Sequence, residues 1–90
     1  MEISYKSAFD AIADTPEEAL NLKIRANLMR EIEIMIKANR WTQKEAAQKL
    51  GVTQPRISDL LRGSISKFSI DMLVNMLATM GGRVELKVVA

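Results

Sequence analysis

The sequence predicts a mainly α-helical protein, with one bundle of about five helices followed by a short C-terminal β-strand. Apolar residues make up 48% of the 90-residue chain, but aromatic residues only 4%. Leu, Ile, Val, Ala and six Met must therefore fill the core, a composition that favours helices over sheets. Helix start and stop signals also recur along the chain. A chain of this length has room for one core and therefore for one domain.

The first element with clear signals is a long helix that follows an N-terminal extension, residues 1–14. Within the extension, residues 7–13 predict a short helix, which a brief strand precedes. Thr15 and Pro16 then place an N-cap residue and a proline in the order that starts a helix. Because the apolar pattern continues to about Ala38, this is the longest predicted helix.

Apolar side chains cover an unusually broad part of this long helix. The face expected to meet the core carries Leu20, Ile24, Leu28, Ile32 and Met35. An adjacent sector carries Leu22, Met29 and Ile36. This is more apolar surface than one core-facing stripe requires. The helix therefore packs on two surfaces or consists of two helices run together.

Three further helices are marked by N-cap residues at Thr42, Thr53 and Ser69. Each cap residue follows a large apolar residue and precedes another apolar residue by four positions, which is the pattern of a hydrophobic staple. Glu45 completes a capping box with Thr42, and glycines supply the stop signals. The predicted helices cover residues 43–50, 54–62 and 70–80.

The C-terminal segment, residues 83–89, changes to a period of two. Val84, Leu86 and Val88 alternate with charged residues, as in a strand with one apolar face. A single strand cannot satisfy its own backbone groups, so it needs a partner. The N-terminal strand, another protein or a second copy can supply one. We favour self-pairing, which makes these residues a dimerisation strand and the protein a homodimer.

The composition argues against an enzyme and against a metal or cofactor site. The chain contains no cysteine and no histidine, so it lacks thiolate ligands and the commonest general base. Its carboxylates show no clustered pair in an apolar setting that would shift a pKa for catalysis. We therefore expect no catalytic residue, no metal and no cofactor.

The sequence predicts a cytoplasmic protein. No apolar run approaches the roughly 20 residues that span a bilayer, and the N-terminus lacks a signal peptide. We expect no membrane partner.

The charges are unevenly distributed along the chain. Residues 42–90 carry seven basic and four acidic residues, whereas residues 1–41 carry six basic and seven acidic residues. The basic excess, which favours a nucleic-acid partner, thus lies in the second half.

Residues 42–63 form the candidate functional unit. Two short helices joined by a tight glycine-bearing turn, the second capped by Thr53, are the arrangement with which proteins place a helix in the major groove of DNA. Ala46 and Ala47 are small enough for the two helices to cross closely. The sequence therefore predicts a helix-turn-helix whose second helix, residues 54–62, contacts double-stranded DNA.

The outward face of this second helix predicts contacts with base edges. Gln54 can pair bidentately with adenine and Arg56 with guanine, while the Pro55 ring can contact a thymine methyl group. Phosphates repel Asp59, which can instead accept from a cytosine amino group or brace an arginine three residues away; we favour the brace. The candidate base-contacting residues are Gln54, Pro55, Arg56, Ser58 and Asp59.

Donors around the second helix predict contacts with DNA phosphates. Gln43 stands at the first position of the preceding helix, where exposed backbone amides favour an anion. The end of the second helix and the loop after it supply further donors. The candidate phosphate-contacting residues are Gln43, Arg62, Ser64, Ser66 and Lys67. Such contacts give affinity and register rather than sequence preference.

The stretch TQKEAAQKLGVTQPRISDLLRG, residues 42–63, resembles the helix-turn-helix of the XRE family, the Cro and phage-repressor type. The shared features are Thr-Gln opening the first helix, Ala-Ala inside it, Leu-Gly at the turn and Val-Thr-Gln opening the second helix. The resemblance implies a lambda-repressor-like bundle in which Gln43 contacts phosphate and Gln54, Pro55 and Asp59 face base edges. Phage repressors often carry a base-contacting Gln where this chain has Pro55.

Two functional hypotheses follow. The first is a homodimeric transcriptional repressor that binds a palindromic operator through helix 54–62. The second comes from the wider chain, which resembles compact XRE regulators, some of them HigA-like antitoxins that bind a small ribonuclease toxin and repress their own operon. The N-terminal extension and the surplus apolar surface at Leu22, Met29 and Ile36 favour a toxin partner. That surface can equally cover a dimer core.

Overall fold

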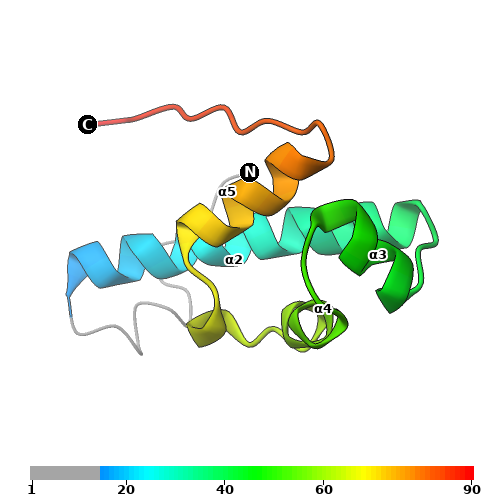
Figure 1. Ribbon diagram of the computed structural model, residues 1–90. Coiled ribbons are helices and arrows are strands. Elements are labelled where there is room, and N and C mark those ends of the chain that lie inside the picture. The colour runs from blue at the N-terminus through cyan, green and yellow to red at the C-terminus, as the bar shows by residue number, and fades with distance from the viewer. Residues whose placement is uncertain (1–14) are drawn as a thin grey trace.

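The computed structural model describes residues 15–90, which are helical apart from the turns and the C-terminal tail. The elements are α2 (Pro16–Ala38), α3 (Gln43–Leu50), α4 (Gln54–Leu61), the 3₁₀ turn η1 (Ile65–Lys67) and α5 (Ile70–Thr79). Figure 1 shows α2 running through the length of the molecule, with α5 crossing it on one side and α4 lying on the other. α3 packs against both α4 and α5, so the four α-helices enclose one core.

The helices begin at the predicted cap residues. Thr15, Thr42, Thr53 and Ser69 each accept a hydrogen bond through the side-chain oxygen from the backbone N–H three residues further on. Glu45 also completes the predicted capping box, because the Thr42 N–H donates to its carboxylate over 3.1 Å. Hydrogen bonding by the Thr42 backbone, and to a lesser degree by the Thr42 side chain, stabilises the Glu45 carboxylate and so lowers the pKa of Glu45.

The predicted helix boundaries are confirmed within one residue. α3 has the predicted bounds, whereas α4 ends at Leu61 and α5 at Thr79, each one residue early. The long helix α2 is a single helix that ends at Ala38. Four of the five predicted helices are present in residues 15–90. The fifth, the short helix expected at residues 7–13, lies outside the described residues.

The core draws side chains from every α-helix. The largest fully buried side chains are Ile32 of α2, Leu50 of α3, Ile57 and Leu60 of α4, and Leu73 of α5. α2 meets α5 along one side and α4 with η1 along another. Most of its broad apolar surface is therefore used within the chain, on two surfaces of one continuous helix, whereas Leu20 and Ile34 stay exposed.

Two predictions about the faces of α2 are corrected. Leu20, expected on the core face, is 59% exposed, because it lines an open groove between the N-terminal half of α2 and the C-terminal tail. Leu22, Met29 and Ile36, expected as surplus surface, are buried. The last two belong to the central core cluster, so neither is available to a partner.

The predicted C-terminal strand is wrong for the single chain. Residues 83–89 are irregular and run back beside α2 in Figure 1. Val84 is half-buried against the core, whereas Leu86 and Val88 are 80% and 92% exposed. A strand needs a neighbour that offers backbone N–H and C=O groups, and no segment in the described part of the chain pairs with the tail.

Candidate nucleic-acid interface

The turn between α3 and α4 is fixed by one glycine and two small residues. Gly51 ends α3 with φ +70°, a left-handed conformation that glycine adopts without strain. The Val52 N–H then donates to the Ala47 carbonyl over 3.0 Å. Ala46 and Ala47 are buried where the two helices meet. Residues 42–63 thus form the predicted pair of helices joined by a tight turn.

A shallow surface depression joins the two helices on their outer side. It brings together six of the ten residues that the sequence predicted to contact DNA, one from the start of α3 and the others from α4 and its C-cap. These residues are Gln43, Gln54, Pro55, Ser58, Asp59 and Arg62. The depression therefore combines predicted base contacts with predicted phosphate contacts.

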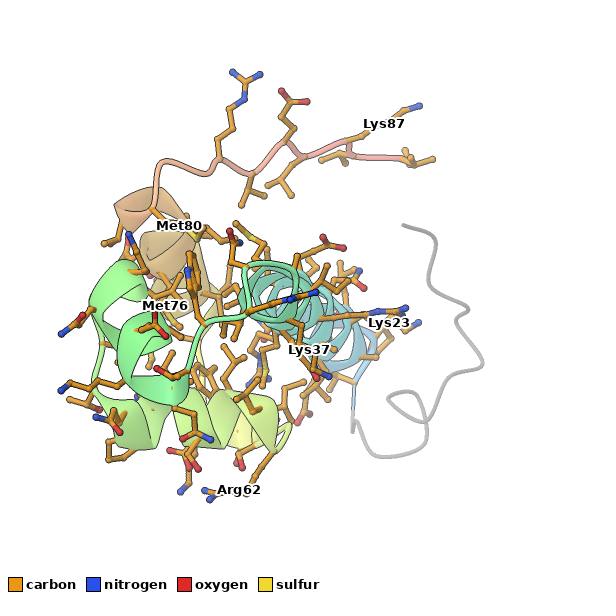
Figure 2. The ribbon with its side chains drawn as sticks, turned by 90° about the vertical axis from the view of Figure 1, so that its right-hand side faces the viewer. Lys23, Lys37, Arg62, Met76, Met80 and Lys87 are labelled. Atoms are coloured by element: carbon orange, nitrogen blue, oxygen red, sulfur yellow. The ribbon has the colours of Figure 1, made fainter. Side chains whose placement is uncertain are left out.

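Asp59 holds two cations at one edge of the depression. Its carboxylate forms an ion pair with Arg62, and the same oxygen, Oδ1, lies 3.5 Å from Nζ of Lys67. Arg62 also donates to Oγ of Ser58 over 3.2 Å. The Asp59 side chain is 14% exposed and that of Arg62 62% exposed, and Figure 2 shows Arg62 pointing away from the body of the molecule. The expected brace therefore holds Arg62.

Arg56, in contrast, is not part of the depression. Its Nη1 donates to the Lys67 carbonyl over 3.0 Å, and its guanidinium carbon lies 5.5 Å from the centre of the Phe68 ring. This cation–π contact with a buried ring holds the arginine against the segment after α4. The helical pattern assigned Arg56 to the outward face, but it could not show that η1 would return beside it.

The remaining predicted phosphate contacts lie on this returning segment. The Ser64 N–H donates to the Asp59 carbonyl over 3.0 Å, which ties the segment to the end of α4. Ser66 and Lys67 are exposed in η1. Lys67 reaches the edge of the depression through Asp59, whereas Ser64 and Ser66 do not line it.

One residue near the interface was not found from the sequence. Arg25 of α2 donates through Nη1 to the carbonyls of Ile65 and Phe68, over 3.2 Å in each case. The contacts join positions 40 and 43 residues apart, so no local pattern indicates them.

The described residues hold no candidate metal site. Within residues 15–90, no group of three or more Asp, Glu, His or Cys side chains is placed to hold an ion. In the same range, no helix combines the length and the apolar character needed to cross a membrane.

Comparison with known families agrees with this geometry. A family model described as a helix-turn-helix domain matches residues 11–89, which include all the described helices. No curated protein gives a significant match to the chain.

Proposed function

Since the chain belongs to the helix-turn-helix domain family, we propose that it binds double-stranded DNA and regulates transcription. The observation that carries the proposal is the depression shared by α3 and α4. A helix that enters the major groove contacts base edges with its N-terminal residues, while the preceding helix crosses the backbone. The grouping of Gln43 with residues of α4 in this depression supports the proposal, because both tasks need side chains on one surface.

The side chains of the depression divide into proposed base contacts and proposed phosphate contacts. Gln54 begins α4 and carries the amide that pairs with adenine, with Pro55 and Ser58 beside it. Gln43 begins α3, where free backbone N–H groups attract a phosphate. Arg62 supplies a charge for a second phosphate. We leave Arg56 out of the base-contacting set, because its guanidinium is engaged with Lys67 and Phe68.

Alanine variants of Gln54 and Arg62 separate these tasks. We expect Gln54→Ala to weaken binding to a duplex selected from a random pool by about 1–3 kcal/mol and to relax preference at one base pair. Arg62→Ala should weaken binding to all duplexes alike and reduce the slope of log affinity against log salt by about one. Titration of selected and random duplexes at several salt concentrations measures both effects.

Gln48→Ala is the matched control, because Gln48 is exposed on α3 but does not line the depression. It should bind like the wild type. If the wild-type chain bound selected and random duplexes equally, sequence-specific recognition would be excluded. Equal losses for Gln54→Ala and Arg62→Ala on every duplex would contradict the division into base and phosphate contacts.

We further propose that the protein is a homodimeric repressor of the XRE type that binds a palindromic operator. The resemblance of residues 42–63 to that family supports the proposal. A two-fold symmetric dimer presents its recognition helices about 34 Å apart, one turn of DNA. Bound to an operator, such a dimer blocks access to the same stretch of DNA.

The exposed tail supplies a self-complementary surface for this dimer. If two copies of residues 83–89 lie antiparallel about Leu86, Val84 of each copy faces Val88 of the other. In the same register Glu85 faces Lys87 twice. Apolar side chains then share one face and opposite charges the other. The apolar face can cover the groove beside Leu20, and the ribbon supplies the backbone partners that a single tail lacks.

Charge reversal tests this register directly. We expect Glu85→Lys or Lys87→Glu alone to weaken the dimer by about tenfold, because each places like charges opposite one another at two positions. The double variant restores opposite charges and should restore the dimer. Sedimentation equilibrium over a range of concentrations measures the three constants. A double variant as weakly associated as either single variant would contradict the register.

The toxin-binding alternative depended on the N-terminal extension, which lies outside the described residues, and on apolar surface of α2 that the structure buries. Leu22, Met29 and Ile36 are buried, so they offer no apolar patch to a partner protein. We therefore do not propose a HigA-like antitoxin on the basis of the described residues.

A further inference from the structure

The turn η1 is held by guanidinium groups from two different helices. From α2, Arg25 donates to the carbonyls of Ile65 and Phe68 through one nitrogen, over 3.2 Å each. From α4, Arg56 donates to the Lys67 carbonyl over 3.0 Å. Three carbonyls of a four-residue segment thus accept from side chains that are distant in the chain.

The two arginines restrict the movement of residues 65–68, whose carbonyls accept their hydrogen bonds. The Phe68 ring is buried beneath Arg56, which anchors the end of the turn in the core. Arg25 is half-buried, and its buried Nε has no hydrogen-bond partner among the described residues. A charged group with an unsatisfied buried donor is costly to place. Its other contacts, to Ile65 and Phe68, must therefore offset that cost.

The position of η1 determines where the ammonium group of Lys67, a proposed phosphate contact, lies. Lys67 is its last residue, and its ammonium group shares the Asp59 carboxylate with Arg62. A displacement of the turn would move Lys67 away from the depression while leaving Arg62 in place, since Arg62 caps α4 itself. The spacing of the two cations therefore depends on η1.

We propose that Arg25 is a positioning residue for DNA binding: it holds η1 so that Lys67 meets a phosphate in register with α4. This inference rests on the proposed DNA-binding function and deepens it. Arg25 itself touches no DNA, because its contacts are made to backbone carbonyls. Preorganising the turn removes an ordering cost that binding would otherwise carry.

A double-mutant cycle between Arg25 and Lys67 tests the proposal. Lys67→Ala should weaken binding to any duplex by about tenfold in the wild-type background, and reduce the salt slope by about one. Arg25→Met should have the same effect, although Arg25 itself contacts no phosphate, because the Lys67 contact depends on the position of η1. Adding Lys67→Ala to Arg25→Met should then change affinity by less than about twofold, because the two changes remove the same contact.

Two further variants distinguish positioning from general effects. Arg30→Met removes the same charge from an exposed position of the same helix, and should leave affinity within about twofold of the wild type. Arg25→Lys keeps a charged donor and should recover part of the loss. Circular dichroism at the assay temperature confirms that each variant is folded. The rate of amide hydrogen exchange at Lys67 and Phe68 should rise in Arg25→Met but not in Arg30→Met.

The outcomes are separable. A wild-type chain that bound no duplex would overturn the proposed function itself. Wild-type binding with additive losses from Arg25→Met and Lys67→Ala would overturn only the role of Arg25. A loss in Arg30→Met equal to that in Arg25→Met would show that charge alone, rather than the position of the turn, is responsible.

Discussion

Replacing Ile57 with alanine is expected to lower the free energy of unfolding by about 2–5 kcal/mol. Ile57 is fully buried in α4, at the centre of the core that all four α-helices share. The truncation removes apolar contacts and leaves a cavity that a close-packed core cannot fill completely. α4 has eight residues, too few to remain helical without packing.

The matched control is Ile34→Ala, the same chemical change at a side chain of α2 that is 47% exposed. It should change stability by less than about 0.5 kcal/mol. Urea unfolding followed by circular dichroism measures both variants. Since a domain of this size has about 5–13 kcal/mol of stability, Ile57→Ala should also lose DNA binding at moderate temperature. Equal losses for the two variants would contradict the assignment of the core.

Replacing Gly51 with alanine is expected to lower the free energy of unfolding by more than the roughly 1–2 kcal/mol of backbone strain alone, and to disturb the angle between α3 and α4. Gly51 has φ +70°, and a Cβ atom there would lie 3.2 Å from Cγ2 of Thr79. Thr79 cannot turn away freely, because its hydroxyl donates to the Asn75 carbonyl over 2.8 Å. The variant therefore combines backbone strain with a close contact against α5.

Two controls separate these causes. Gly63 has nearly the same conformation, φ +74°, but no atom lies within 4 Å of a Cβ placed there, so Gly63→Ala should show the backbone cost alone. Thr79→Ser removes Cγ2, and Gly51→Ala in that background should cost no more than Gly63→Ala. Thermal unfolding compares the three single variants and the double variant with the wild type. A Gly51→Ala cost that Thr79→Ser leaves unchanged would show that the contact contributes nothing.

The sequence was sufficient for features that depend on near neighbours in the chain. Thr42 and Glu45 specify a capping box because both partners lie within one helical turn. Gln54 and Ser58 share the depression because they are four residues apart on one helix. The start of α3 reaches the same place because two alanines and Gly51 fix how the helices cross.

Features that depend on distant segments could not be predicted. Helical periodicity ranked the faces of α2, but it could not show how far the other elements extend along it, so Leu20 was placed in the core and Leu22 outside. Arg25 and Arg56 owe their contacts to the path of η1, which no local pattern encodes. The alternation in residues 83–89 indicated a strand, but pairing requires a second segment.

The ion pairs of Asp59 bear on how fast a DNA-binding protein of the proposed kind finds its specific site. Random DNA is bound through phosphate charge alone, and at this edge the carboxylate neutralises one of the two cations that Arg62 and Lys67 provide. For the proposed function, this shortens residence on random DNA. Sliding and hopping along DNA then lose less time to random sites, while the proposed base contact of Gln54 prolongs the stay at a specific one.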